Sequence, residues 1–449
     1  MRIEIYESKL ANDLISLFFL LFVLLLPFDS VRFINTSYCP LSLIPFVILF
    51  VLCLPKIFSD GFTPSLKYYS LFYLCSSLIS LIQTYVNNNL SLFFDYFVTL
   101  SIGFFLFATM NVILSNGFDN GREFLFKLCK LIAIAYFCPV FIALIDLFAV
   151  NNILIPYGVS TFIHGIFGGS QPIRVCGTTS ESAWLCMHLF FAFFAYFYLF
   201  RHDYRRKLNA FMMFLMAFIL LLSFSTLGYA VLAFFLFYVL LVSLKKNGLK
   251  FYNFGVPLAL IAAFLILKNF VIPRMDQSLY FVQRFYHLSI SYLIHNDSSV
   301  FIRLINPTIA LIMGAQNLLF GVGGGQYSFF YESYVKKYFP FGLEFYAGNN
   351  EIVTTIAQGN ANSKCLYARL FGENGLFSLL YFVMIHQVFK NVRNNSFLKY
   401  WLVVMLIIMF QFDSLCYFPF IFVLSVCNSY KEDDFDDYCR YLSELQWLE

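Results

Sequence analysis

Apolar runs separated by short polar turns fill most of the sequence. A helix needs roughly 20 apolar residues to cross a bilayer, and many of the runs are near that length. The pattern predicts an all-α polytopic membrane protein with about twelve transmembrane helices. They are expected at residues 14–28, 40–54, 68–85, 90–114, 124–150, 183–200, 209–225, 229–244, 252–272, 375–388, 398–412 and 415–429. The tenth helix is expected to begin some residues earlier, near Tyr367.

Composition supports the same class of protein. Hydrophobic residues make up 60% of the chain and charged residues only 12%, whereas a soluble domain carries about 25% charged residues. An ordinary soluble domain is therefore excluded. No small-residue cleavage site follows the first apolar run, which predicts an uncleaved first helix rather than a signal peptide.

The distribution of Lys and Arg predicts the orientation. Cytoplasmic loops carry an excess of these residues, and placing the N-terminus in the cytoplasm puts nearly all cations of the short loops there. Only Arg32 and Arg174 then fall in short outer loops, and both termini are cytoplasmic. The chain accordingly divides into nine helices over 1–272 with a smaller outer loop at 151–180, a large outer loop at 273–374, three helices over 375–429, and a tail at 430–449.

The smaller outer loop places one arginine among glycine and hydroxyl residues, in the stretch GGSQPIRVCGTTSESAW. Arg174 can bind a phosphate through its planar guanidinium, or it can simply extend its head to the membrane interface. Ser180 can cap the following helix while Glu181 lies in its first turn, which is a structural alternative to a role in a site.

A second arginine precedes a predicted short helix in the large outer loop. Asn306-Pro307 predicts an N-cap and a first-turn proline for a helix ending near Gly321, about 21 Å long and too short to cross a bilayer. Arg303 and the free N–H groups at that helix start favour an anion. Gly321 to Gly325 can form a nest of N–H groups for an anion, or a hinge. The small and polar residues of the helix form one face that can roof a site: Asn306, Ala310, Gly314 and Asn317.

The end of the large loop gathers polar and ionisable residues at the membrane boundary: Asn349, Glu351, Asn362, Arg369 and Glu373. Ionisable groups at such depth are functional candidates. The histidines on this side show no ligand spacing, so no metal site is expected. Most of the 11 cysteines lie within apolar runs, but Cys176 and Cys365 lie outside them, and a disulfide between these two is one hypothesis.

Three segments carry a family resemblance: RVCGTTSESAW, FIRLINPTIALIMGAQNLLFGVGGGQY and NSKCLYARLFGENGLFSLLYF. Together they resemble the signature regions of the bacterial O-antigen polymerase and ligase superfamily, and best its Wzy-type polymerases. The family's Arg-x-x-Gly element matches Arg174 and Gly177. Its arginine before a short helix that ends in Gly-x-Gly matches Arg303 with Gly321 and Gly323. Its Glu-x-Gly element matches Glu373 and Gly375. Ligases usually carry a His-Asn pair shortly before the last element, where this chain has NSKC, so the resemblance favours a polymerase.

The resemblance implies a metal-independent glycosyltransferase of the bacterial inner membrane that uses no cofactor. It would move a growing O-antigen chain from one undecaprenyl diphosphate carrier onto the next carrier-linked repeat unit, at the periplasmic face. The implied partners are the lipid-linked oligosaccharide, the bilayer and, as a further candidate, a chain-length regulator, with no nucleic acid. The expected catalytic residues are Arg174, Arg303, Glu373 and Glu351. The expected substrate-binding residues are Gly177, Glu181, Gly321, Gly323, Tyr327, Asn362 and Arg369.

The chemistry of the two outer loops agrees with this expectation. A departing diphosphate concentrates negative charge that arginines can stabilise, and a carboxylate can deprotonate the acceptor hydroxyl. Two rival classes stay open. A lipid-linked oligosaccharide flippase should carry charges within its helices, whereas the predicted helices here are almost uncharged. Asp95 and Asp146 are exceptions, and each can equally be an isolated buried carboxyl hydrogen-bonded to a neighbour. A non-catalytic scaffold would use the large loop as a docking surface.

Overall fold

The computed structural model describes residues 3–29, 40–59, 63–117, 121–169, 174–223, 225–247, 269, 298–340 and 351–430. Across these ranges the chain forms helices and no strand, which confirms the all-α prediction. The ninth predicted helix, apart from residue 269, the beginning of the large outer loop, and the tail from 431 lie outside the described residues.

The described helices follow the apolar runs closely. In chain order they are α1 (Lys9–Leu25), α2 (Leu43–Ser59), α3 (Pro64–Val86), α4 (Leu90–Gly117), α5 (Gly121–Val150), α6 (Tyr157–Phe167), α7 (Ser182–His202), α8 (Arg206–Leu222), α9 (Thr226–Asn247), α13 (Ser298–Gln316), α14 (Tyr327–Tyr338), α16 (Glu351–Gln358), α17 (Leu366–Asn374), η3 (Gly375–Phe377), α18 (Ser378–Asn391), α19 (Ser396–Ile408) and α20 (Phe418–Ser429). Short helix α6 forms within the loop predicted at 151–180. Helices α14 and α16 add to the large loop.

Five described helices are long and apolar enough to cross a membrane: Pro64–Val86, Leu90–Asn116, Gly121–Val150, Ser182–His202 and Leu366–Asn391. The last of these confirms that the tenth predicted helix begins near Tyr367. Within the described residues, most other predicted spans form shorter helices, and the 17 residues of α1 reach only about 25 Å against a hydrocarbon core of about 30 Å, although α9 has 22 residues. Twelve crossings therefore stay a prediction.

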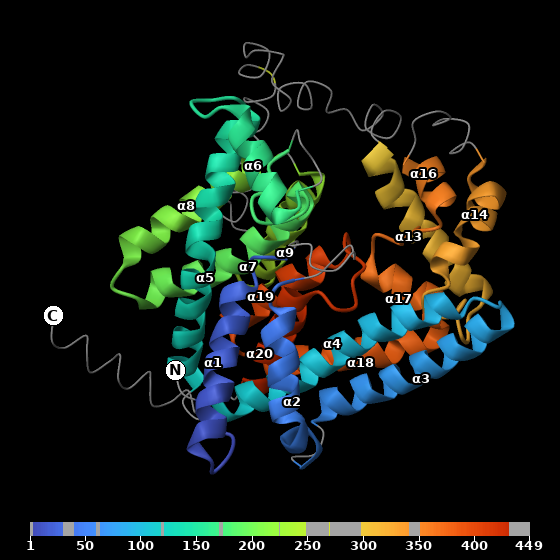
Figure 1. Ribbon diagram of the computed structural model, residues 1–449, viewed down its shortest axis with the longest axis horizontal. Helices are drawn as coiled ribbons and strands as arrows, with labels where there is room; N and C mark the ends of the chain where they lie inside the picture. Colours follow the sequence, from blue (N-terminus) through green and yellow to red (C-terminus); the bar gives the residue numbers. More distant parts are fainter. Residues whose placement is uncertain are drawn as a thin grey trace.

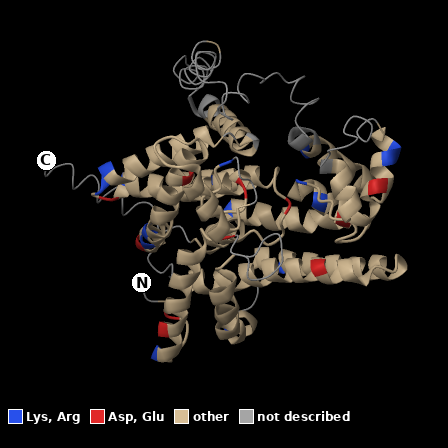
Figure 2. Ribbon diagram, turned by 45° about the horizontal axis from the view of Figure 1, so that its top comes forward, with Lys and Arg blue, Asp and Glu red and all other residues tan. Residues whose placement is uncertain are grey.

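The surface of α3 shows how such a helix meets its surroundings. Leu71, Leu74, Leu78 and Ile82 follow one another at helical spacing and are 47–63% exposed, so an apolar stripe faces outward. Figure 2 shows most charged residues at helix ends and in loops, with long uncharged helix bodies between them. An outward apolar face suits a bilayer and not water on a helix whose only charged residue, Lys67, lies in its first turn.

One large core joins most of the long helices. Helix α20 packs on α4, α18 on α3, and α7 on α5 and α8, and aromatic rings fill much of the space between them. Tyr69 shows this pattern, since its ring meets Phe104, Phe107 and Tyr381 edge-on at 5.4 to 5.6 Å between centroids. Such edge-to-face contacts add to the apolar area that the rings bury.

A second, smaller core lies within the described part of the large loop. It joins α13, α14, α16 and the start of α17, and Figure 1 shows these helices grouped beside the ends of α3 and α4. The small face predicted on α13 packs against α17 and does not roof an open site. A Cβ on Gly314 would overlap Phe371, and a Cβ on Gly372 would overlap the carbonyl of Ala310. Small residues at this crossing therefore let the two helix backbones approach closely.

The predicted start of α13 is wrong. The helix begins at Ser298, and Asn306 with Pro307 lies in its interior. Pro307 has no backbone N–H, so it cannot donate to the carbonyl one turn earlier, at Arg303. Asn306 is only 2% exposed and uses its side chain in the second core instead of capping a helix.

Candidate functional site

A break in one membrane-length helix forms the base of the candidate site. Gly375 ends α17 with a φ of 55°, and a single 3-10 turn leads on to α18. Residues 318–323 fill the break, and the N–H of Leu376 donates to the carbonyl of Leu318 at 2.8 Å. A broken helix leaves backbone groups that must be satisfied, and irregular backbone within a membrane is tolerated where it is buried in protein or lines a cavity.

The N–H groups of the glycine loop, Gly321 to Gly325, donate hydrogen bonds to the protein itself. The N–H of Gly323 donates to the backbone carbonyl of Glu373 at 2.9 Å, and that of Gly324 to the hydroxyl of Ser80 at 2.8 Å. The Gly325 N–H hydrogen-bonds the Glu373 carboxylate. The loop therefore does not present a free nest of N–H groups for an anion, and Gly321 and Gly323 lie outside the cavity described next.

A polar cavity of about 180 Å³ opens beside this loop. Its walls come from α4, the glycine loop, the segment before α17, α17 itself and the loop after α19. The lining residues are Leu92, Asp95, Tyr96, Thr99, Gly325, Tyr327, Ser328, Ala361, Asn362, Ser363, Arg369, Glu373 and Asp413. Four of the sequence-predicted site residues meet here, namely Tyr327, Asn362, Arg369 and Glu373. We name this space the inner cavity.

An ion pair between Arg369 and Glu373, which lie one helical turn apart on α17, dominates the inner cavity. The Nε of Arg369 lies 3.0 Å from Oε2 of Glu373, and the two side chains are 20% and 2% exposed. Arg369 also donates from Nη1 to the backbone carbonyl of Asp413 at 3.0 Å, and its guanidinium lies 5.7 Å from the centre of the Tyr96 ring. Shielding from water strengthens such charge-assisted contacts. Both charged groups are therefore fixed by the protein.

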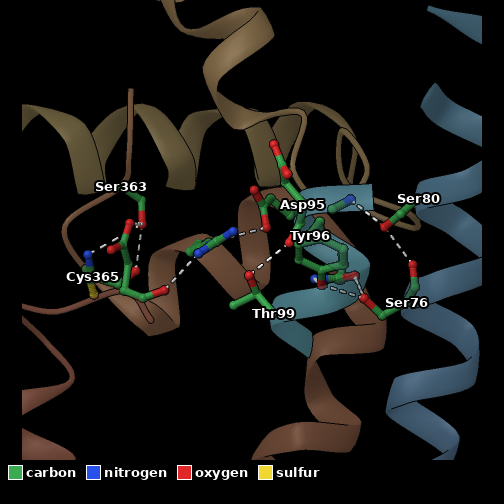
Figure 3. Close-up of polar contacts among 12 residues, drawn as sticks. Ser76, Ser80, Asp95, Tyr96, Thr99, Ser363 and Cys365 are labelled. Atoms are coloured by element: carbon green, nitrogen blue, oxygen red, sulfur yellow. Dashed lines mark hydrogen bonds and ion pairs between the residues drawn. The ribbon is translucent and has the colours of Figure 1, made fainter. Parts of the chain in front are cut away.

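Helix α4 supplies the opposite wall, shown in Figure 3. The Tyr96 hydroxyl lies 2.6 Å from that of Ser76, which donates to Oδ1 of Asn374 at 2.6 Å. Thr99 donates to the backbone carbonyl of Asp95 at 2.8 Å. The Asp95 side chain is exposed and lines the cavity, and within the described residues its carboxylate makes no hydrogen bond to the protein. Asp95 is therefore the carboxylate that a ligand can engage without breaking a protein contact.

Asp413 provides the third carboxylate. Its Oδ2 accepts hydrogen bonds from the Ser363 hydroxyl and the Lys364 N–H, both at 3.2 Å, which holds the segment before α17 against the loop after α19.

Burial raises the pKa of the neighbouring Cys365 thiol, so this thiol stays protonated. Cys365 and Cys176 are both free thiols, and the hypothesis of a disulfide between them is wrong.

Tyr327 closes the side of the inner cavity that faces the second core. Its buried hydroxyl donates to the Asn306 carbonyl at 2.9 Å, while the Tyr331 hydroxyl donates to Oδ1 of Asn306 at 2.7 Å. Burial raises the pKa of Tyr327 well above 10, so the phenol remains a donor at physiological pH. Asn306 in turn donates from Nδ2 to the carbonyl of Asn362 at 2.8 Å, which ties the cavity wall to α13.

The cavity carries more negative than positive charge. Asp95, Glu373 and Asp413 face one guanidinium, that of Arg369. A diphosphate would be repelled there, whereas a neutral ligand rich in hydroxyl groups could donate to the carboxylates. Sequence reasoning considered Asp95 only as an isolated acid and missed Asp413, which precedes α20 without any motif.

The Arg174 segment is anchored elsewhere, by a buried carboxylate. Asp146 of α5 is fully buried and accepts the N–H of Gly177 at 2.9 Å. Its other donors are Ser160 at 2.6 Å, the Cys176 N–H at 2.8 Å and His164, whose Nε2 lies 3.0 Å away. Asp146 is therefore a buried carboxyl hydrogen-bonded to its neighbours, which confirms one of the two interpretations of this residue from the sequence, and it fixes the loop that carries Arg174.

The remaining sequence-predicted residues do not line the inner cavity. Glu181 is itself the N-cap residue of α7, and its side chain makes no capping hydrogen bond within the described residues. The prediction that Ser180 is the cap is therefore wrong. Arg303 is half-buried on α13. Glu351 begins α16, and its side chain lies outside the described residues.

The fold and the site define a multi-pass helical membrane protein with an acidic cavity at a broken helix. No protein-family model and no curated protein matches the chain. Among the described residues, no group of three or more His, Cys, Asp and Glu side chains is placed to hold a metal ion.

Gly324→Ala is expected to destabilise the protein by about 1–3 kcal/mol through overpacking. A Cβ at this position would overlap the buried Tyr96 ring and the Ser80 hydroxyl. The matched control is Gly165→Ala in α6, where a Cβ meets nothing within 4 Å and alanine should be neutral or slightly stabilising. Thermal unfolding of both purified variants in detergent measures the difference, and equal midpoints would contradict the packing described.

Proposed function

We propose that the chain polymerises lipid-linked oligosaccharide repeat units, as a Wzy-type O-antigen polymerase. The observation that supports this most is the convergence of two resemblance-bearing segments, the glycine loop and residues 362–375, on one acidic cavity at a broken helix. The third segment ends nearby, because Trp184 at the start of α7 meets the ring of Phe412 at 5.4 Å, next to Asp413.

The proposed reaction is a glycosyl transfer. The acceptor hydroxyl oxygen attacks the anomeric carbon of the donor sugar, and the bond from that carbon to the diphosphate oxygen breaks. The hydroxyl proton passes to a carboxylate, and the carrier diphosphate leaves with the electron pair. Positive charge develops on the sugar in such transition states, and an acidic cavity stabilises it. Arg174 and Arg303 are proposed to stabilise the departing diphosphate from outside the cavity.

The carboxylates of the cavity suit different roles. Glu373 is held by Arg369 and by the glycine loop, so we assign it to charge stabilisation and positioning of the acceptor. Asp95 lines the cavity without a hydrogen bond to the described part of the protein, which leaves it free to accept the acceptor proton. Glu351 stays a second candidate base from the sequence.

The proposal includes a location and partners. Twelve helices with both termini in the cytoplasm would place the inner cavity at the periplasmic face of the bacterial inner membrane, where undecaprenyl-diphosphate-linked repeat units are presented. The carrier lipid would lie in the bilayer beside the apolar helix faces. A chain-length regulator is a further proposed partner.

Reconstitution tests the function directly. Purified protein in detergent is incubated with carrier-linked repeat units, with a chelator present and no nucleotide, because the diphosphate bond already supplies the free energy. A ladder of products differing by one repeat unit is expected. Transfer only to lipid A-core acceptors would indicate a ligase, and movement of the substrate across vesicles without bond formation would indicate a flippase. Either result would overturn the polymerase proposal.

A further inference from the structure

A second cavity adjoins the inner one on the side away from the Arg369–Glu373 ion pair. Its volume is about 240 Å³, and we name it the outer cavity. It is lined by Asn89, Leu92, Ser328, Phe329, Tyr331, Glu332, Thr355, Ile356, Gly359 and Ala361. Leu92, Ser328 and Ala361 line both cavities, so the two spaces share a wall.

The outer cavity differs from the inner one in chemistry. Its single carboxylate, Glu332, forms an ion pair with Lys336 one turn along α14, with 2.5 Å between the charged atoms. Asn89 and Thr355 contribute an amide and a hydroxyl, and Phe329 presents a ring that is 48% exposed. The outer cavity is therefore close to neutral, with an aromatic face and hydrogen-bonding groups around it.

Together the two cavities have the volume of a small-molecule site. Small-molecule sites usually enclose about 300–1,000 Å³. Neither the inner cavity, about 180 Å³, nor the outer one, about 240 Å³, reaches this range alone, but together they do. The outer part lies between the α3–α4 turn, α14 and α16, and so leads from the broken helix into the second core. A ligand that filled both would be elongated and would place one end beside the carboxylates.

We propose that the outer cavity is a subsite for a neutral oligosaccharide, which binds the sugar units next to the reacting sugar. Sugars have apolar C–H faces that pack on aromatic rings and hydroxyl rims that hydrogen-bond to amides and hydroxyls, and the outer cavity offers both. The inner cavity then holds the reacting sugar among its carboxylates. The reaction step rests on the proposed function, but the binding of the oligosaccharide does not.

Phe329→Ala tests the subsite, and the chain offers a matched control. Phe211, on α8, is also about half exposed, at 50%, and it lines neither cavity. Both variants remove an exposed ring, so both should fold, which their thermal unfolding midpoints check. Thr355→Ala, on α16, is a second variant of the outer cavity that removes a hydroxyl without opening the core.

The probe is the mixture of repeat-unit oligosaccharides released by partial hydrolysis of the source strain's surface polysaccharide, without a carrier lipid. Its affinity for the purified protein is measured by calorimetry, and KM and kcat are measured with carrier-linked units. Phe329→Ala is expected to weaken binding and raise KM about 5-fold to 10-fold, with kcat within about twofold. Phe211→Ala should change neither.

The outcomes separate the subsite from the reaction. Binding that Phe329→Ala weakens, in the absence of any product ladder, would support the subsite and overturn the polymerase. A ladder with an unchanged KM and affinity in Phe329→Ala and Thr355→Ala would overturn the subsite and leave the polymerase standing. A loss confined to kcat would also overturn the subsite, because it would place the ring at the reacting atoms. Wild-type protein that neither binds the oligosaccharides nor forms a ladder would overturn both.

Discussion

Asp95→Asn is expected to lower kcat for polymerisation about 100-fold to 10,000-fold, the usual contribution of a general base. Asparagine keeps the size and hydrogen-bonding shape of the side chain but cannot accept a proton from the acceptor hydroxyl. Because Asp95 is exposed and its carboxylate has no hydrogen bond within the described part of the protein, the substitution should leave folding intact. Steady-state rates of repeat-unit addition at equal protein concentration measure the effect.

A surface carboxylate serves as the control for this substitution. Glu123→Gln removes a 59% exposed carboxylate that pairs with Lys127 on α5 and lines neither cavity, and it should be silent. Wild-type turnover in Asp95→Asn would assign the proton transfer to another group and remove Asp95 from the mechanism.

The helices were predictable because their cause is local. An apolar run with few charges can satisfy its backbone in a membrane only as a helix, so composition and period suffice to locate one. The lengths of the helices were less predictable. Helix α19, of 13 residues, ends at Ile408, before the predicted end at 412, and α20, of 12 residues, begins at Phe418, after the predicted start at 415. Their ends depend on how the loop between them, with Asp413 and Tyr417, packs against α17 and α7.

The site was predictable only in part, and the reason is again the range of the interactions. Arg369 and Glu373 stand out as charges beside an apolar run, and one helical turn separates them, so their pairing is local. Asp95 and Asp413 join them from sequence positions about 270 residues before and 40 residues after, through tertiary packing that no motif encodes. The helix start predicted at Asn306-Pro307 was wrong for a related reason. Its pattern resembles a helix start, but buried contacts with Tyr327 and Tyr331 place it mid-helix.

Arg369→Met is expected to destabilise the protein by about 3–5 kcal/mol, the cost of breaking a buried ion pair from one side. Arg369 makes three contacts in the cavity, to the Glu373 carboxylate, the Asp413 carbonyl and the Tyr96 ring. Without it, the carboxylate of Glu373 stays buried with the Gly325 N–H as its remaining donor. An uncompensated buried charge is the main cost. Thermal and denaturant unfolding in detergent measure the loss.

A second substitution should then restore stability without restoring activity. Adding Glu373→Gln to Arg369→Met removes the uncompensated charge, keeps an oxygen to accept from the Gly325 N–H, and turns the amide nitrogen toward the cavity. The double variant is therefore expected to unfold within about 2 kcal/mol of wild type, since replacing both members of a buried pair is often nearly neutral. It should still make no polymer, because the charge that stabilises the reacting sugar is gone. A double variant that folds and polymerises at the wild-type rate would limit the Arg369–Glu373 pair to a structural role.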